Sequence, residues 1–312
     1  MYEQHALRSL RAELQQLKVG PVLTCAPLHT QTTWRIGGPA DILLRPPTIE
    51  ALQTILAFAQ KRQLPLTLLG SGSNVLVSDK GLRGLVVHLA PGLNAIDFHG
   101  TQVTAQAGAL ISTLAYQAAQ HSLSGLAWAE GIPGSVGGAV VMNAGAYGGR
   151  IADCLQSVTY LTPEGALHTI TAESFELAYR SSAFQSSGSI IVSADFALTP
   201  GDRQAILAEM ALYHEKRQQY QPLELPSAGS VFKNPPGQKA ARLIEAAGAK
   251  GWRVGDAQVS PKHCNFIVNC GHAACADVLT LMARVQQAVL AHSGILLERE
   301  VILLGEEKMP LL

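Results

Sequence analysis

The sequence predicts an α+β protein of more than one domain, and three observations support this prediction. The chain has 312 residues, more than one hydrophobic core usually holds. Short apolar runs typical of strands alternate with the apolar periodicity of amphipathic helices. Glycine-rich stretches lie among these elements, and no internal repeat or low-complexity tract interrupts them. Together these patterns indicate an α+β or α/β architecture.

The N-terminal half begins with a polar helix near residues 3–17 and a strand at "ADILLRP". A helix follows over 48–62, where Leu52, Ile55, Leu56 and Ala59 form one apolar stripe. Further strands are expected at "LPLTLLG", "GLVVHLA", "NAIDF" and "QVTAQAG". A helix over about 109–121 completes this half of the chain.

The C-terminal half contains strands near 155–161 and 189–198, followed by a boundary at "TPGDRQ". Asp202 is placed there to cap a helix that runs to about residue 218. A short helix near 239–247 and a long one over about 274–292 come next, and "EREVILLGE" reads as a final strand. The long helix carries an apolar face of Val278, Leu281, Met282, Val285 and Val289.

Composition excludes several classes of partner. Lys and Arg total 23 and balance the 23 Asp and Glu, and no basic run occurs. A nucleic-acid groove or an anionic membrane surface needs concentrated positive charge, so we expect neither partner. No segment has the apolar length of a membrane span, and the N-terminus lacks the apolar core of a signal peptide. We therefore expect a cytoplasmic protein.

The five cysteines are an odd number and form no C-x-x-C pair. This pattern argues against a disulfide framework and agrees with a reducing compartment. Cys264, Cys270 and Cys275 lie near His263 and His272 in sequence, but their spacings match no zinc template. We expect buried structural cysteines and no metal.

Two glycine clusters raise the question of a bound cofactor. The first is Gly70, Ser71, Gly72, Ser73 and Asn74, and the second is Gly134, Ser135, Val136, Gly137 and Gly138. Neither matches the dinucleotide or P-loop fingerprint. Successive backbone N–H groups in a tight turn nevertheless form a concave anion site, and small residues let a diphosphate approach them. Tight turns at crowded crossings remain the alternative, above all for the first cluster. The seven glycines of "GIPGSVGGAVVMNAGAYGG" (131–149) favour a phosphate-bearing cofactor.

Three polar residues in apolar surroundings are candidate catalytic groups. They are Arg180 in "LAYRSSAF", Ser230 in "PSAGSVFKNP" and Glu300 in "LLEREVILL". Each also has a structural alternative: a surface arginine, a turn serine and an edge-strand carboxylate. The nucleophile pattern G-x-S-x-G is absent around Ser230. The residues alone indicate a cofactor enzyme and no specific reaction.

Six motifs in order carry a resemblance to a known family. They are "TTWRIGGPADILLRP", "GSGSNVLVSDKG", "EGIPGSVGGAVVMNAGAYGG", "YRSSAF", "PSAGSVFKNP" and "LEREVILLGE", and they extend over about residues 33–306. This set resembles the UDP-N-acetylenolpyruvoylglucosamine reductases, flavoenzymes of bacterial peptidoglycan precursor synthesis. The resemblance implies non-covalent FAD in a domain of the p-cresol methylhydroxylase type, held by the two glycine clusters, and a C-terminal α+β substrate-binding domain.

On this resemblance we expect four regions: an N-terminal helix and lead-in (1–29), an FAD-binding region (30–200, divided near 80), a substrate-binding domain (201–300) and a tail (301–312). The short spacing between Arg180 and Ser230 resembles the second type of the family, which lacks a tyrosine-bearing insertion. Arg150, where an acidic residue is expected, and Tyr220, where threonine is usual, depart from the pattern.

The implied reaction reduces UDP-N-acetylglucosamine enolpyruvate to UDP-N-acetylmuramate. NADPH would reduce FAD, whose N5 would deliver hydride to C3, and Ser230 would give a proton to C2. Arg180 would bind the substrate carboxylate, and Glu300 would donate a hydrogen bond to it if burial keeps Glu300 protonated.

Four further residues would bind substrate by the same resemblance: Asn234, Lys233, Lys216 and Arg217. For the last two, a solvated helix turn is an equal alternative. A flavin oxidase that uses oxygen and a non-catalytic flavin- or nucleotide-sugar-binding protein are the rival functions. The sequence indicates no particular oligomeric state.

Overall fold

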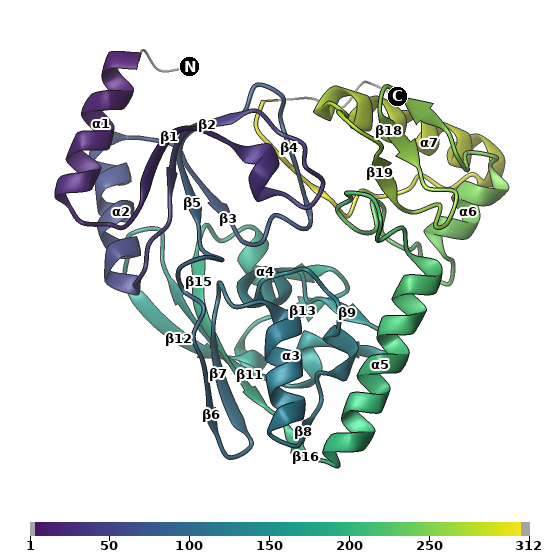
Figure 1. Cartoon of the computed structure of the whole chain (residues 1–312), viewed down its shortest axis with the longest axis horizontal. Helices are drawn as coiled ribbons and strands as arrows, with labels where there is room; N and C mark the ends of the chain where they lie inside the picture. The colour runs from purple at the N-terminus through teal and green to yellow at the C-terminus, as the bar shows by residue number, and fades with distance from the viewer. Residues whose placement is uncertain (1–3, 307–312) are drawn as a thin grey trace. The chain divides into compact units, whose positions relative to one another are not determined.

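The computed structural model describes residues 4–306, which pack as two compact units (Figure 1). The first unit comprises 4–24, 41–71 and 84–215, and the second comprises 25–40, 72–83 and 216–306. Residues 25–40 and 72–83 thus pack with the C-terminal part of the chain. The expected regions, which divide the chain into consecutive pieces with a boundary near residue 201, do not include this arrangement. Across the described residues, no helix combines the length and apolar character needed to cross a membrane.

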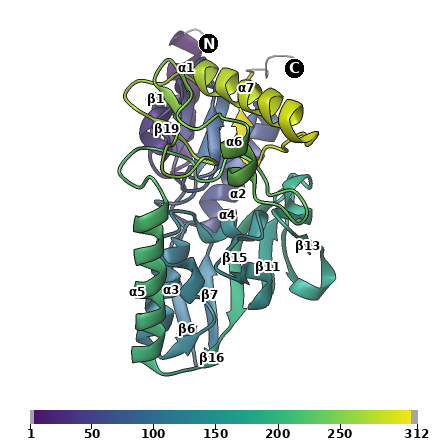
Figure 2. The same ribbon diagram turned by 90° about the vertical axis from the view of Figure 1, so that its right-hand side faces the viewer.

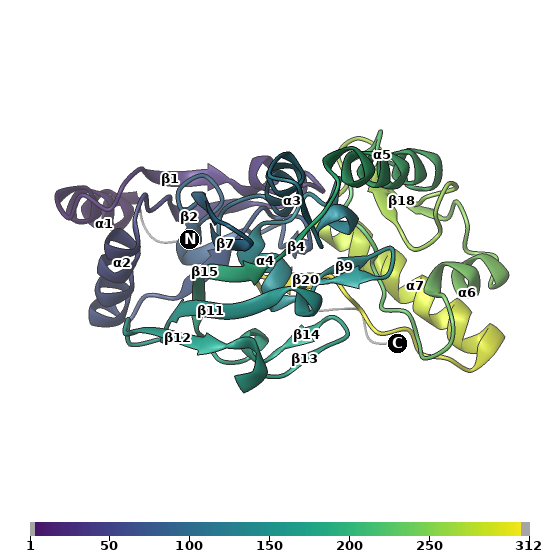
Figure 3. The same ribbon diagram turned by 90° about the horizontal axis from the view of Figure 1, so that it is seen from below.

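A five-stranded antiparallel sheet forms the centre of the first unit, in the order β12-β11-β15-β7-β6 (Figure 3). Its strands are β6 (Ile96–His99), β7 (Gln102–Gln106), β11 (Leu155–Leu161), β12 (Leu167–Thr171) and β15 (Ile190–Ala197). Alternate residues of β15 are buried, with Val192, Ala194 and Phe196 on the inner face. Helix α4 (Val136–Val141) packs against β15 and β7 (Figure 2). Helix α3 (Ile111–Gln120) contributes Leu114 to the same core.

A four-stranded sheet in the order β1-β2-β5-β3 lies beside helices α1 (Gln4–Gln16) and α2 (Ile49–Arg62) (Figure 1). Its strands are β1 (Val22–Pro27), β2 (Pro39–Leu44), β3 (Leu66–Leu69) and β5 (Leu82–His88), and β3 and β5 are parallel. Thr48 caps α2, because its hydroxyl accepts the Ala51 N–H at 3.2 Å. The stripe expected on α2 is buried.

Helix α5 (Arg203–Tyr220) begins where the sequence predicts. The Asp202 carboxylate accepts hydrogen bonds from the backbone N–H groups of Gln204 and Ala205, each at 3.2 Å. These bonds satisfy amides that have no partner inside the helix. The predicted cap is therefore confirmed.

The second unit is built around helix α7 (Cys275–Ser293), which packs against α6 (Ala240–Ala246) and β18. The five residues expected on the apolar face of α7 are all buried. The sheet beside it contains β17 (Arg253–Val254), β18 (Ala257–Val259) and β19 (Ile267–Asn269). Strand β20 (Ile302–Leu304) pairs in parallel with β4 (Val75–Val77). The final strand predicted at "EREVILLGE" is therefore confirmed over residues 302–304, within the region that the domain division names a tail.

Several short elements escaped sequence analysis because small or polar residues carry no clear periodicity. Helix α4 lies inside the glycine-rich segment, where packing on the sheet overrides the low helix propensity of glycine. The short strands are β8 (Leu123–Ser124), β9 (Gly145–Ala146), β10 (Gly149–Arg150), β13 (Leu177–Ala178), β14 (Ser181–Ser182) and β16 (Thr199–Pro200). The 3₁₀ turns are η1 (Leu28–Gln31), η2 (Ala127–Ala129), η3 (Ile151–Asp153), η4 (Ala172–Ser174) and η5 (Ala183–Gln185).

Candidate functional site

Two extended segments, one with Ser230 and the other with Glu300, pair in the second unit. The Glu300 N–H donates to the Val231 carbonyl at 2.8 Å, and the Lys233 N–H donates to the Glu298 carbonyl at 2.8 Å. Phe232 pairs with Arg299 between these two bonds. Ser230 and Glu300 are both partly buried. Two residues far apart in sequence therefore lie on neighbouring segments.

Asn74, the last residue of the first glycine cluster, adjoins the Glu300 segment. Its side-chain Nδ2 donates to the Glu300 carbonyl at 3.3 Å, and its own carbonyl accepts the Ile302 N–H at 3.0 Å. These bonds continue into the pairing of β4 with β20. A glycine cluster and a candidate catalytic residue thus meet within one unit.

The other end of the first cluster meets the second cluster in the first unit. A Cβ atom on Gly70 would lie 2.4 Å from the Ser135 Oγ, so a larger residue there would displace the Ser135 hydroxyl. The Ser71 hydroxyl is buried without a hydrogen-bond partner among residues 4–306. A buried hydroxyl normally has a partner, so this group fits a ligand that supplies one. The residues around Gly70 therefore fit a phosphate-bearing cofactor.

Protein packing explains much of the glycine content of the second cluster and its flanks. A Cβ atom on Gly137 would lie 2.9 Å from the Ala107 Cβ, and one on Gly149 would lie 2.2 Å from the Trp128 ring. A Cβ atom on Gly145 would lie 2.6 Å from the Gly149 carbonyl. The idea that the whole segment clears space for a cofactor is too broad, because these three glycines face the protein.

The backbone N–H groups of Val136 and Gly137 are also used within the protein. They donate to the carbonyls of Ala109 and Ala107 at 2.8 and 2.9 Å. The Gly138 N–H likewise donates to the Ser135 Oγ, at 3.4 Å, but Gly138 is exposed, and a Cβ there would meet only that Oγ, at 3.3 Å. Gly134, Ser135 and Gly138 remain the members of the cluster best suited to face a cofactor.

Arg180 lies in the two-residue turn of the β13–β14 hairpin in the first unit. Its φ of +54° is left-handed, which is uncommon for a residue other than glycine. The Arg180 Nη2 donates to the Gly145 carbonyl at 3.1 Å. Buried Asn143 donates from Nδ2 to the Ala178 carbonyl at 2.9 Å. The glycine-rich segment thus anchors the hairpin that carries Arg180, a role that sequence analysis missed.

The four candidate substrate-binding residues occupy different environments. Lys233 forms an ion pair with Glu298, with 2.5 Å between Nζ and Oε1. The Asn234 Oδ1 accepts the Ala240 N–H at 3.0 Å, at the start of α6. Lys216 is partly buried, and Arg217 is only 7% exposed. The alternative of a solvated helix turn is therefore wrong for Arg217.

The two departures from the family pattern both lie on the surface. Arg150 pairs with Asp153 at 2.9 Å, and both side chains are exposed. An exposed pair of this kind contributes about 0–1 kcal/mol. The Tyr220 side chain is 58% exposed, at the end of α5.

His88 is a buried histidine that sequence analysis did not identify as important. It is 7% exposed at the end of β5 and forms a hydrogen bond with the backbone of Gly70. Burial, and then the positive charge of Arg45, lower the pKa of His88 to about 4, although the Gly70 bond acts in the opposite direction. A neutral imidazole therefore supports the first glycine cluster. Its place in the apolar run "GLVVHLA" was the only sequence clue.

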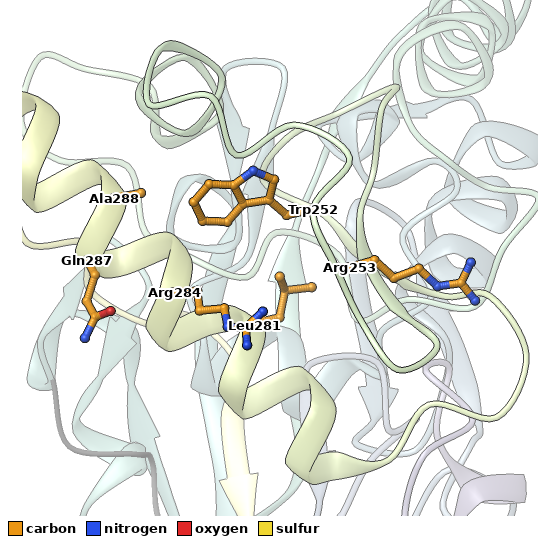
Figure 4. Close-up of a pocket in the computed structure, with 6 residues that line it drawn as sticks. All are labelled: Trp252, Arg253, Leu281, Arg284, Gln287 and Ala288. Atoms are coloured by element: carbon orange, nitrogen blue, oxygen red, sulfur yellow. The ribbon is translucent and has the colours of Figure 1, made fainter.

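Two surface hollows lie away from these residues. The first, of about 610 Å³, is bordered by α7 and by Trp252 and Arg253 (Figure 4). The second, of about 520 Å³, lies over the five-stranded sheet and includes Asp195. Neither is lined by a predicted site residue. In the part of the chain that the structure describes, no three His, Cys, Asp or Glu side chains group as a metal site would require.

Comparison with known families gives two matches. The model of an FAD binding domain matches residues 40–171. The model of the C-terminal domain of UDP-N-acetylenolpyruvoylglucosamine reductase matches residues 221–304. An FAD-binding domain followed by a reductase C-terminal domain confirms the predicted cofactor and the mixed α and β fold class.

Individual proteins agree with these matches. The chain is 48% identical to a UDP-N-acetylenolpyruvoylglucosamine reductase of Agathobacter rectalis, over 96% of this chain and 98% of that protein. It is 45% identical to the enzyme of that name from Desulforamulus reducens, over 96% and 99% of the two chains. The crystal structure of the Thermus caldophilus reductase superposes with a TM-score of 0.79 at 39% identity, covering 91% of this chain and 98% of that one.

Proposed function

Because the chain belongs to the UDP-N-acetylenolpyruvoylglucosamine reductase family of FAD-dependent oxidoreductases, we propose that it reduces UDP-N-acetylglucosamine enolpyruvate to UDP-N-acetylmuramate with NADPH. This reaction belongs to peptidoglycan precursor synthesis, and we assign it to the cytoplasm. The observation that carries the proposal is that the segment with Glu300 is hydrogen-bonded both to the segment that carries Ser230 and to Asn74.

We assign FAD binding to the region where the two glycine clusters meet. The Ser71 hydroxyl, buried without a partner among the described residues, is the first candidate hydrogen-bonding group for the cofactor. Gly134, Ser135 and Gly138 would offer a close backbone approach to its diphosphate. When bound, FAD supplies, after reduction by NADPH, the hydride that reduces C3 of the enolpyruvyl group.

Ser230 is assigned the proton donor to C2. Negative charge develops at C2 during reduction and spreads into the adjacent carboxylate. A serine hydroxyl is a weak acid, but a developing carbanion is a strong enough base to accept its proton. Glu300, on the neighbouring segment, is assigned a hydrogen bond to the same carboxylate, which it would donate when protonated.

Arg180 is assigned to the substrate carboxylate. Its planar guanidinium offers two parallel N–H donors, which suit a carboxylate better than a single point charge does. A fixed positive group also stabilises the charge that builds up in the transition state.

Lys233, Asn234, Lys216 and Arg217 are assigned to the UDP-sugar. Lys233 is already paired with Glu298, so substrate would exchange one anionic partner for another. Arg217 is buried, and a buried guanidinium requires compensating groups around it.

The test separates the two halves of the reaction in Ser230→Ala. The bound flavin should be bleached by NADPH at the wild-type rate, since Ser230 acts only on the substrate. Reoxidation by UDP-N-acetylglucosamine enolpyruvate, followed by stopped-flow absorbance, should slow by about 10²–10⁴-fold. Ser227→Ala is the matched control. Ser227 accepts the Thr33 hydroxyl through its backbone carbonyl, at 2.7 Å, and alanine keeps that carbonyl.

One result would refute the role of Ser230, and another would refute the proposed reaction. Turnover of Ser230→Ala within a few-fold of wild type would remove the serine from the mechanism. Wild-type protein that binds FAD but is reoxidised only by oxygen would favour the rival oxidase.

A further inference from the structure

Asn265 supports the segment that carries Ser230 in an unusual way. Its side chain is 3% exposed. The side-chain amide forms two hydrogen bonds with the backbone of Phe232, one to its N–H and one to its carbonyl, like those that a neighbouring strand would form. The Asn265 Oδ1 accepts the Phe232 N–H at 3.0 Å, and its Nδ2 donates to the Phe232 carbonyl at 2.8 Å. The Asn265 backbone carbonyl also accepts the Val231 N–H at 2.8 Å.

The opposite edge of the same segment is held by the Glu300 segment. There the Val231 carbonyl accepts the Glu300 N–H, and the Lys233 N–H donates to the Glu298 carbonyl. The Ser230 segment is therefore bonded on both edges, although only isolated bridges flank it. The amide of Asn265 supplies the donor and the acceptor that a regular strand would have offered.

We infer that Asn265 is a positioning residue for the reaction, because it fixes the register in which the segment that carries Ser230 pairs with the segment that carries Glu300. This inference rests on the proposed role of Ser230 as proton donor. Without the amide, the N–H and carbonyl of Phe232 lose their partners inside the core, where Phe232 is 1% exposed. Unpaired buried groups of this kind favour a shift of the backbone toward new partners. Such a shift moves the Ser230 hydroxyl away from C2.

Two substitutions remove the hydrogen bonds between Asn265 and Phe232 to different extents. Asn265→Asp keeps an acceptor for the Phe232 N–H but loses the donor to its carbonyl, and Asn265→Ala loses both. Reoxidation of the reduced enzyme by UDP-N-acetylglucosamine enolpyruvate should slow by about 10- to 100-fold in Asn265→Ala and less in Asn265→Asp, since small misplacements of reacting groups have effects of this size. Flavin reduction by NADPH should stay within about two-fold of wild type.

Asn269→Ala is the matched control. Asn269 is equally buried at 3% exposure in the same unit, and its Nδ2 donates to the Trp34 carbonyl at 3.1 Å. It should lower the melting temperature without slowing reoxidation selectively. If Asn269→Ala produced the same selective slowing, Asn265 would have only a general structural role.

A double substitution tests whether Asn265 acts through Ser230. Once Ser230→Ala has removed the hydroxyl, adding Asn265→Ala should slow reoxidation by less than about two-fold. If the two effects multiply instead, Asn265 acts independently of Ser230 and the inference is wrong.

Hydrogen–deuterium exchange gives a readout that does not depend on the proposed function. The measurement uses FAD-loaded Asn265→Asp, which retains the bond from the Phe232 N–H and serves even if Asn265→Ala does not fold. Peptides covering 230–233 should exchange faster in this variant than in wild type. Unchanged exchange in this segment would overturn the inference. A wild-type protein inactive on the substrate would refute the proposed function, while exchange would still decide whether Asn265 holds the segment.

Discussion

His88 should make the stability of this protein depend on pH below neutrality. Its pKa is lowered from 6.5 to about 4 in the folded protein, mainly by burial and then by Arg45. The unfolded chain therefore binds a proton at a higher pH than the folded protein does. Stability from the neutral imidazole is fully present above about pH 6.5 and is lost as the pH falls toward about 4.

The size of the effect follows from these two pKa values. A difference of about 2.5 pH units corresponds to about 3 kcal/mol once both states can be protonated. At pH 5 the loss relative to pH 7 is about 2 kcal/mol by the same linkage relation. At about 2–4 °C per kcal/mol for domains of this size, the melting temperature should fall by about 4–8 °C.

The assay compares melting of wild type and His88→Gln between pH 7 and pH 5. The glutamine amide cannot take up a proton in this pH range, so the variant should lose less stability on acidification than wild type does. His99→Gln, at an exposed histidine, is the control and should retain the wild-type decrease. An equal decrease in His88→Gln and wild type would show that other groups cause the acid sensitivity. Because His88 bonds to Gly70, flavin fluorescence should also report earlier FAD release in wild type at pH 5.

Four further substitutions test the site and the fold. Gly138→Val should weaken FAD binding, measured by flavin titration, with little change in melting temperature. Gly137→Val should instead destabilise the fold, because Ala107 occupies the space that a Cβ on Gly137 needs. If both variants had the same effects on FAD binding and melting temperature, this division of roles would be rejected. Arg180→Lys keeps the charge but loses the planar fork, so stopped-flow should show slower reoxidation by substrate and normal reduction by NADPH. Equal losses in both steps would assign Arg180 to folding. Asp202→Ala should lower the unfolding free energy by about 1 kcal/mol in denaturant titrations, and no change would mean that solvent replaces the cap.

Sequence patterns predicted the features that depend on neighbouring residues. The extent of α2 and the Asp202 cap of α5 both arise from residues within four positions of one another. The buried face of α7 follows from the same local periodicity. Motif order also identified the family, because each motif is a local string.

The sequence by itself thus determined the main helices and strands, the family and the identities of the candidate groups, whereas the tertiary structure decided their neighbours. The segments of Ser230 and Glu300 pair, and Gly70 meets Ser135, only through contacts between distant parts of the chain. The same holds for Gly137, whose neighbour Ala107 gives it a packing role, and for buried Arg217. Local propensity carries no information about such contacts, since they form only when the chain closes long loops and buries apolar surface on both sides.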